Sequence, residues 1–315
     1  MSNPSTQTDD TQLTRLRNAS LTALSPRRAA LYGLLSVVAV LFLLPLEAAV
    51  MTSFKTVSGF ANTLPFAPPP PEGATVSGWI EAWNGLRAAM INSALFVLPA
   101  TFILPVLGSL SAFGLTITKW RGQLAVYTLF MVGIFIPLQA VLVPLSIIWQ
   151  TASIQSLLAN LGPVNVWNLP LMREHYAQFL ELAITHIAFG IPLSTLLFRS
   201  HHQDLPDEMI EAARLDGVGL FTIYRRIVLP LSKPVFVVVM ILAFTTIWND
   251  LLFALVIVSD PLAEPATVAF ASIAGGRVQE FNVIMAAGFI TALPTLLVHI
   301  TFTRQFAEGF SQTGA

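Results

Sequence analysis

Residues 204–234 read DLPDEMIEAARLDGVGLFTIYRRIVLPLSKP and separate two long apolar stretches of the chain. The apolar side chains of this segment recur at steps of three and four residues, which is the spacing of one face of a helix. Acidic residues lie at its beginning and Arg225 and Arg226 lie near its end, an order that complements the helix dipole. The segment is therefore predicted to be an ordered amphipathic element and not a flexible linker.

Two glycines divide this element. Gly217 and Gly219 permit a bend, and Pro230 and Pro234 end the helix before the next apolar stretch. An amphipathic helix that lies on a membrane surface usually carries several basic residues on its polar face, whereas the first half of this one is acidic. We therefore expect it to bind another protein. Its predicted apolar face consists of Ile210, Ala213, Gly217, Leu220, Phe221, Tyr224, Ile227 and Val228.

The composition of the whole chain is that of a membrane protein. Of its 315 residues, 55% are hydrophobic and only 10% are charged, whereas about 25% are charged in ordinary soluble domains. Six apolar stretches are long enough to cross the hydrocarbon core, which needs roughly 20 helical residues. They are residues 29–53, 89–117, 123–149, 177–199, 234–258 and 283–303. The sequence predicts an all-α integral membrane protein with about six transmembrane helices.

The basic residues indicate the orientation of these spans. With the amino terminus inside, 12 of the 16 Lys and Arg residues lie on the cytoplasmic side of the membrane and 4 lie outside. This bias predicts a multi-pass protein of the cell membrane with both termini in the cytoplasm. The first stretch is too long for the apolar region of a signal peptide and lacks a clear cleavage site. We expect a cytoplasmic tail at 1–28, a transmembrane domain at 29–303 and a second cytoplasmic tail at 304–315.

The segment 204–234 resembles the EAA motif of importer-type ABC permeases. That motif reads Glu-Ala-Ala, three residues, Gly, nine residues, Ile, one residue, Leu-Pro, and every position matches. The matching residues are Glu211, Ala212, Ala213, Gly217, Ile227, Leu229 and Pro230. Shorter matches between about residues 30 and 310, such as Trp248-Asn249-Asp250, resemble maltose-type carbohydrate permeases. The end of the chain is most similar to the glucose-type branch.

The resemblance implies the type I permease fold of ABC importers, with this loop as a coupling helix. It implies an importer of a sugar, such as glucose or another mono- or oligosaccharide, in which this chain forms half of the pathway. The implied partners are a second homologous permease subunit, two ATPase subunits, a solute-binding protein, the sugar and the lipid bilayer. The chain has no G-x-x-x-x-G-K-[ST] loop, so ATP and Mg are expected on the ATPase subunits and no cofactor on this chain. Nothing indicates a nucleic-acid partner.

The stretch 234–258 contains the candidate substrate pathway. A sugar at membrane depth needs hydrogen-bonding partners, because burying its hydroxyls without them is costly. Thr245, Trp248, Asn249 and Asp250 supply such groups. The alternative is that these side chains make hydrogen bonds between helices. A further segment, 151–176, is longer than the connection expected in the family and would face the solute-binding protein.

Two other functions compete with the importer interpretation. An ion-coupled secondary transporter would use Glu47, Glu181 and Asp250, but the chain has no evident inverted repeat and the acidic loop would have no role. An intramembrane enzyme is disfavoured because the chain has neither HExxH nor GxSxG, so we expect no catalytic residue.

The chain has no cysteine, and His186 has no second His or carboxylate at ligand spacing. No metal site is expected.

Overall fold

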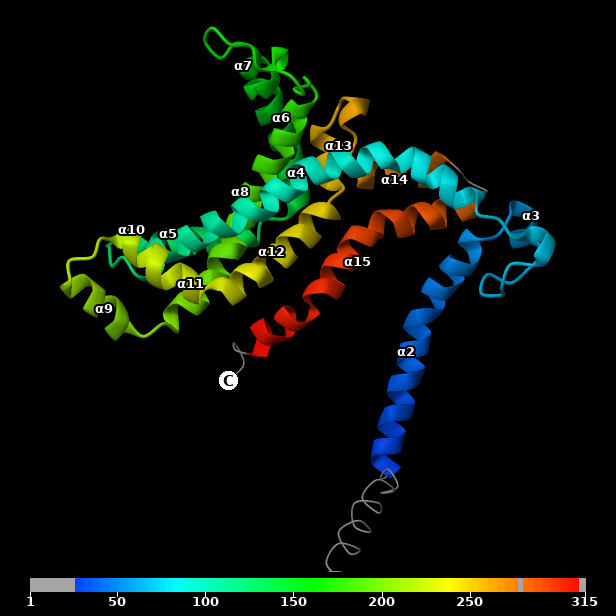
Figure 1. Cartoon of the computed structure of the whole chain (residues 1–315), viewed down its shortest axis with the longest axis horizontal. Helices are drawn as coiled ribbons and strands as arrows, with labels where there is room; N and C mark the ends of the chain where they lie inside the picture. The colour runs from blue at the N-terminus through cyan, green and yellow to red at the C-terminus, as the bar shows by residue number, and fades with distance from the viewer. Residues whose placement is uncertain (1–25, 277–279, 312–315) are drawn as a thin grey trace, which may run out of the picture. The chain divides into compact units, whose positions relative to one another are not determined.

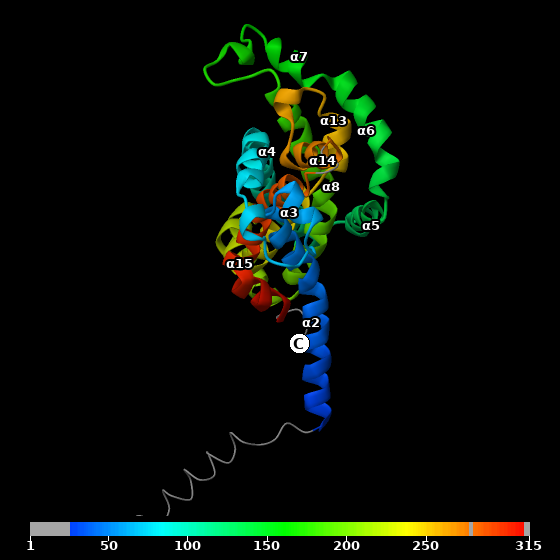
Figure 2. The same ribbon diagram turned by 90° about the vertical axis from the view of Figure 1, so that its right-hand side faces the viewer.

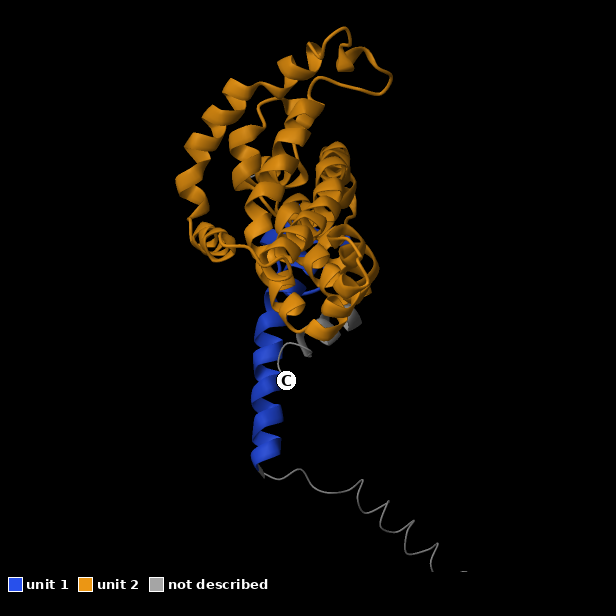
Figure 3. Ribbon diagram, turned by 90° about the vertical axis from the view of Figure 1, so that its left-hand side faces the viewer, with its two compact units in different colours: residues 1–74 blue, residues 75–315 orange. Residues whose placement is uncertain are grey.

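The structure is a computed structural model that describes residues 26–276 and 280–311. Most of the predicted amino-terminal tail, the last residues of the carboxy-terminal tail and Arg277 lie outside this range. The chain forms two compact units, residues 1–74 and residues 75–315 (Figure 3).

The first unit contains one long helix and a short folded segment. Helix α2 (Pro26–Ser53) is followed by α3 (Val57–Ala61) and the 3-10 turn η1 (Pro71–Gly73). Lys55 is fully buried, and its ammonium donates hydrogen bonds to the carbonyls of Leu64 at 2.7 Å and Pro65 at 3.2 Å. A buried ammonium group needs such acceptors. Lys55 therefore holds the proline-containing loop closed.

The second unit consists of helices joined by loops (Figure 1). Its longest helices are α4 (Ser77–Thr116), α8 (Tyr176–Gln203) and α15 (Phe281–Ser311). Between them lie α5 (Gln123–Ile134), α6 (Leu138–Ala152), α7 (Ile154–Ala159), η2 (Val166–Asn168), α12 (Lys233–Trp248), α13 (Leu252–Ile257), η4 (Pro261–Ala263) and α14 (Ala266–Gly276). The loop between α8 and α12 contains α9 (Asp207–Leu215), α10 (Leu220–Ile223), the π-helical turn η3 (Tyr224–Val228) and α11 (Leu229–Leu231).

The all-α membrane fold with about six spans is confirmed. Five of the described helices are long and apolar enough to cross a membrane, and a sixth span results if two helices bent by 76° are counted as one. The five are Arg27–Ser53, Ser77–Thr116, Leu138–Ala159, Tyr176–Gln203 and Phe281–Phe302, and the bent pair is Leu220–Leu231 with Lys233–Trp248.

Two predicted spans are interrupted in the structure. The stretch 123–149 divides into α5 and α6 at Pro137, which has no N–H to continue a helix and disfavours helical geometry in the residue before it (Figure 2). The stretch 234–258 divides after Trp248, and α13 begins only at Leu252. In addition, α4 begins at Ser77 and not at 89, because its first turns are packed and include the fully buried Leu86.

Helices α4 and α8 pack closely at two small residues. Gly108 of α4 faces Ser194 of α8, and Gly190 of α8 faces Leu104 of α4, so closely that an added Cβ at either glycine would collide with the opposite side chain. Small residues at a crossing let two helix backbones approach. The core around this crossing includes Phe96, Val97, Leu104, Leu182, Phe198, Val239, Phe244, Ile247 and Phe253. The α4–α8 pair is therefore the centre of the second unit.

The segment between α13 and α14 is fixed to α4 by two polar side chains. The amide of Asn92 donates hydrogen bonds to the carbonyls of Leu262 at 2.9 Å and Glu264 at 3.0 Å. The hydroxyl of Ser93 accepts a hydrogen bond from the N–H of Ala266 at 2.9 Å, in the first turn of α14. The beginning of α14 is therefore held in place by side chains far away in the sequence.

The packing at Gly108 generates a stability prediction. Gly108→Ala should lower the free energy of unfolding by about 1–3 kcal/mol, because the added methyl group forces α4 and α8 apart. Gly114→Ala is the matched control on the same helix, since a Cβ at Gly114 meets nothing within 4 Å. The midpoint of thermal unfolding in detergent should fall for the first variant and stay or rise for the second. Equal midpoints for both would show that the close crossing is not a constraint.

Candidate functional site

The first half of the loop between α8 and α12 is helix α9, which ends in a defined cap. Gly217 has a φ of +75°, its N–H donates a hydrogen bond to the carbonyl of Arg214, and the N–H of Val218 donates to the carbonyl of Ala213, both at 3.0 Å. These two hydrogen bonds form a Schellman motif, in which glycine adopts the left-handed conformation without strain. The predicted bend at Gly217 is confirmed, and its cause is the end of α9.

The buried side of the loop packs against the end of α4. Tyr224 meets Phe113 edge to face at 5.3 Å, and its hydroxyl donates a hydrogen bond to Ser109 Oγ at 3.2 Å. The guanidinium of Arg214 donates a hydrogen bond to the carbonyl of Ile117, the C-cap residue of α4, at 2.7 Å. The last carbonyls of a helix have no partner within the helix, so Arg214 satisfies one of them from α9. The apolar cluster at this contact contains Phe113, Ile117, Ile210, Ile223, Tyr224 and Val228.

The second half of the loop reaches the next span through a sharp bend. The segment from α10 to α11 includes the π-helical turn η3 and meets α12 at 76°. Ser232 lies at the bend, where its hydroxyl donates a hydrogen bond to the carbonyl of Val228 at 2.8 Å and lies 3.2 Å from Nε2 of His202 on α8. The loop is thus attached to both α4 and α8, so a displacement of the loop acts on both helices.

The outer side of the loop exposes large apolar side chains. Leu215 is 89% exposed, Phe221 is 71% exposed and Leu220 is 47% exposed; we call these three residues the apolar tip. The prediction of one continuous apolar face is wrong, because α9 and α10 are separate helices and the spacing does not continue across the break. Exposed apolar residues gathered on an ordered element mark a surface that binds a partner.

The seven motif positions divide between the two sides of the loop. The exposed ones are Glu211, Ala212, Gly217 and Pro230, and the half-buried ones are Ala213, Ile227 and Leu229. The half-buried side chains pack on the apolar cluster at the end of α4.

Sequence reasoning missed Arg214 and Leu215, which lie inside the motif. The basic residue in the last turn of α9 was a signal for a capping role, but its acceptor on α4 is set by tertiary structure.

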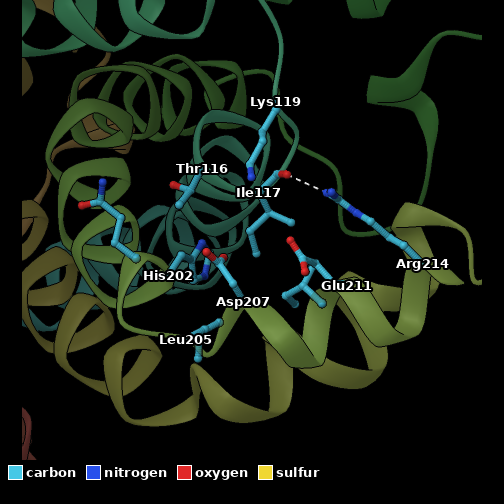
Figure 4. Close-up of a pocket in the computed structure, with 10 residues that line it drawn as sticks. Thr116, Ile117, Lys119, His202, Leu205, Asp207, Glu211 and Arg214 are labelled. Atoms are coloured by element: carbon cyan, nitrogen blue, oxygen red, sulfur yellow. Dashed lines mark hydrogen bonds between the residues drawn. The ribbon is translucent and has the colours of Figure 1, made fainter.

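A cavity of about 320 Å³ lies between α9 and the ends of α4 and α8 (Figure 4). It is lined by the acidic Asp207 and Glu211 and by the basic Lys119 and Arg214. Among the residues that the structure describes, these four form no ion pair within 4.0 Å. Both signs of charge therefore remain available beside the apolar tip.

Three of the four predicted pathway residues make hydrogen bonds within or between helices. The indole N–H of Trp248 donates to the carbonyl of Thr291 on α15 at 2.9 Å, and Trp248 is buried. The hydroxyl of Thr245 donates to the carbonyl one turn earlier at 2.8 Å. The amide of Asn249 donates to the carbonyl of Thr245 at 2.8 Å and lies 3.3 Å from Thr295 Oγ1 on α15. Trp248 and Asn249 therefore join the end of α12 to α15, while Thr245 bonds within α12.

Asp250, the fourth predicted pathway residue, lies at the break between α12 and α13. Its carboxylate accepts hydrogen bonds from the N–H groups of Phe253 at 3.1 Å and Ala254 at 3.4 Å. Its Oδ2 atom is 3.6 Å from Nε2 of His186 on α8. Asp250, His186 and Thr246 line a largely apolar cavity of about 270 Å³. This His–carboxylate pair was missed because the two residues are far apart in the sequence.

Two observations on the described part of the chain concern the metal site and the ion pathway considered above. No group of three His, Cys, Asp or Glu side chains that could hold a metal ion occurs there. Glu181 and Asp250, two members of the ion pathway considered above, line different cavities.

Comparison with known proteins identifies relatives along most of the chain. Residues 104–308 match the family described as binding-protein-dependent transport system inner membrane component. The xylose/arabinose import permease protein of Haloferax volcanii is 43% identical over 90% of this chain and 92% of its own length. A probable ABC transporter permease protein of Pyrococcus horikoshii is 37% identical over 91% and 97%. The glucose import system permease protein of Saccharolobus solfataricus is 27% identical over 90% and 93%.

A solved structure has the same fold. A chain of a bacterial ABC transporter involved in the import of the acidic polysaccharide alginate matches with a TM-score of 0.65. The match covers 91% of this chain and 99% of that chain at 15% identity. The likeness concerns the arrangement of the helices, since so few residues are shared.

The cap of α9 generates a second prediction. Gly217→Ala should destabilise the end of α9 by about 1–2 kcal/mol, because an L side chain in the left-handed conformation is strained. Gly219→Ala is the matched control, since Gly219 has a φ of −68° and open space around it. Hydrogen exchange of the amides of α9 in the detergent-purified protein should become faster in the first variant only. Unchanged exchange in Gly217→Ala would contradict the capping role.

Proposed function

The chain belongs to the family of binding-protein-dependent transport system inner membrane components, and from this premise we propose that it forms half of the pathway of a sugar importer. It is the permease subunit of an ABC importer, it lies in the cell membrane, and it is a transporter component and not an enzyme. An ion-coupled secondary transporter is not favoured by these relatives.

The apolar tip carries the proposal for energy coupling. Leu215, Leu220 and Phe221 are exposed on a loop that is tied to α4 by Arg214 and Tyr224. In our proposal the loop inserts into a groove on an ATPase subunit, and the attachment to α4 transmits the movement of that subunit. The proposed coupling residues are Glu211, Ala212, Ala213, Gly217, Ile227, Leu229 and Pro230.

The proposed orientation places the loop and both termini in the cytoplasm. It is supported by the distribution of Lys and Arg, 12 of 16 on that side, which follows the positive-inside rule. The proposed transmembrane domain spans residues 29–303, with cytoplasmic tails on either side. Hydrolysis of ATP, with its Mg, takes place in this proposal on two separate ATPase subunits.

The second half of the pathway is supplied in this proposal by a homologous permease subunit, and a solute-binding protein delivers the sugar. The proposed pathway residues of this chain are Thr245, Trp248, Asn249 and Asp250. Asp250 is the one of these that lines the cavity beside His186, so we assign it the contact with substrate and assign the other three the positioning of the helix break.

The names of the relatives guide the choice of sugar. The relative that is 43% identical is named for xylose and arabinose, and the one that is 27% identical is named for glucose. We propose a monosaccharide as substrate, with the two pentoses tested first.

Reconstitution of the complex tests the proposal. The chain is co-expressed with its partner permease, ATPase and binding-protein subunits, purified and placed in proteoliposomes, and the uptake of xylose, arabinose and glucose is measured with and without ATP. Uptake that requires ATP and the binding protein supports the proposal. Uptake by the purified chain alone, driven by an ion gradient, would contradict it.

The contact between the apolar tip and an ATPase generates a third prediction. The chain has no cysteine, so a single cysteine can be introduced at Leu215, and Leu262, exposed on η4, provides the control position. Labelling of L215C by a maleimide should be fast in the isolated chain and at least about tenfold slower in the complex with the ATPase subunits, because a buried thiol is shielded from the reagent. Labelling of L262C should not depend on the ATPase. Equal labelling of L215C with and without the ATPase would contradict the proposed contact between the apolar tip and an ATPase subunit.

A further inference from the structure

A polar cavity lies at the end of α8 that is remote from the loop between α8 and α12, which we call the coupling loop after its proposed role. It has a volume of about 200 Å³ and is lined by residues of α6, α8 and α13 and of the segment around α7. Ala177, Gln178 and Glu181 contribute to it from the first turns of α8. With a rise of 1.5 Å per residue, Glu181 lies about 33 Å along the helix from its last residue. The cavity and the coupling loop therefore lie at opposite ends of one span.

The walls of this cavity carry the groups that hydroxyl-rich ligands use. Trp149 adds an indole, and the polar lining comes from Ser146, Gln150, Ser153, Gln155, Gln178, Glu181 and Ser259. Hydroxyl and amide groups both donate and accept hydrogen bonds, and a carboxylate accepts two or more. An indole offers an apolar face against which the C–H groups of a sugar ring can pack. The combination suits a polar ligand without charge.

The positions of these side chains are fixed by the surrounding structure. The indole N–H of Trp149 donates to Thr185 Oγ1 at 2.9 Å, and that hydroxyl donates to the carbonyl of Glu181 at 2.7 Å. The amide oxygen of Gln178 accepts hydrogen bonds from the N–H groups of Ser259 and Asp260, both at 3.2 Å. Side chains held in this way lose little entropy when a ligand binds. The cavity is therefore preorganised.

Glu181 places a buried carboxylate in this cavity. The residue is only 8% exposed, and no Lys, Arg or His nitrogen in the described chain lies within 4.0 Å of its carboxylate. The protein provides the N–H of Ile154 as a partner. A buried carboxylate needs several donors to offset the loss of hydration. Hydroxyl groups of a ligand would supply the remaining ones.

The backbone beside this carboxylate is strained. Ser153, which lines the cavity, has a φ of 43° and a ψ of 69°, a left-handed conformation that is uncommon for residues other than glycine. Such strain persists where the surrounding structure requires it, and it concentrates at ligand sites. It turns the chain from α6 into α7, which brings the N–H of Ile154 to Glu181.

We propose that this cavity, which we call the α8 entrance site, binds one neutral sugar ring at the extracytoplasmic mouth of the pathway. The inference rests on the proposed function, since it assigns the site where the sugar is held after delivery and before it enters the membrane. The cavity is smaller than the roughly 300–1,000 Å³ of drug-sized ligand pockets. Its volume therefore suits a single sugar ring.

Binding to the purified complex tests the site. Tritiated D-xylose is titrated against the detergent-purified complex without binding protein, in the wild type and in Glu181→Leu. The loss of charge-assisted hydrogen bonds should weaken binding about 10- to 100-fold. Glu72→Leu, on the exposed turn η1, is the matched control and should bind like the wild type. Ser146→Leu, which fills the cavity and leaves the carboxylate in place, should also weaken binding.

Uptake measurements separate the failure of this inference from the failure of the proposed function. Loss of xylose binding in both cavity variants, with basal ATP hydrolysis unchanged, supports the α8 entrance site. If the wild type imports xylose with ATP while Glu181→Leu and Ser146→Leu bind xylose normally, the site is overturned and the importer assignment stands. If the wild-type complex shows no ATP-driven uptake of any of the three sugars, the proposed function itself fails. Binding of sodium in place of xylose, lost in Glu181→Leu, would also overturn the sugar site.

Discussion

The carbonyl end of α4 needs hydrogen-bond donors, and the loop between α8 and α12 supplies one through Arg214. That hydrogen bond, together with the packing of Tyr224 on Phe113, gives the loop a fixed place on the membrane-spanning helices. Without such an attachment, a short helix like α9 would be marginal in water. With this attachment, one side of the loop exposes the apolar tip and the other side packs against α4.

The same helices that receive the loop also position the other features of the second unit. Gly108 and Ser194 let α4 and α8 pack closely, α4 holds the beginning of α14 through Asn92, and α8 contributes walls to all three cavities discussed above. A tightly packed interior transmits displacement because it cannot deform smoothly. The α4–α8 pair therefore connects the loop between α8 and α12 mechanically to the opposite end of the span.

The sequence was sufficient for features that local chemistry controls. Apolar stretch lengths predicted the approximate number of spans, and glycine chemistry predicted the break at Gly217. Features that depend on tertiary contacts could not be predicted from spacing. The partner of Arg214 and the pair His186–Asp250 require chain segments that are remote in the sequence to meet. Trp248 was expected in the substrate pathway, and its indole bonds to Thr291 because α15 packs beside α12.

If the loop and α4 move together, the number of sugar molecules imported per ATP hydrolysed depends on Arg214, which joins them. The comparison is made in proteoliposomes between wild type, Arg214→Met and, as control, Arg225→Met, which removes an exposed guanidinium from the same loop. Arg214→Met should keep the ATPase bound and hydrolysing ATP while sugar import per ATP falls, and Arg225→Met should leave this ratio unchanged. An unchanged ratio in Arg214→Met, with the complex intact, would show that the loop and α4 do not move together.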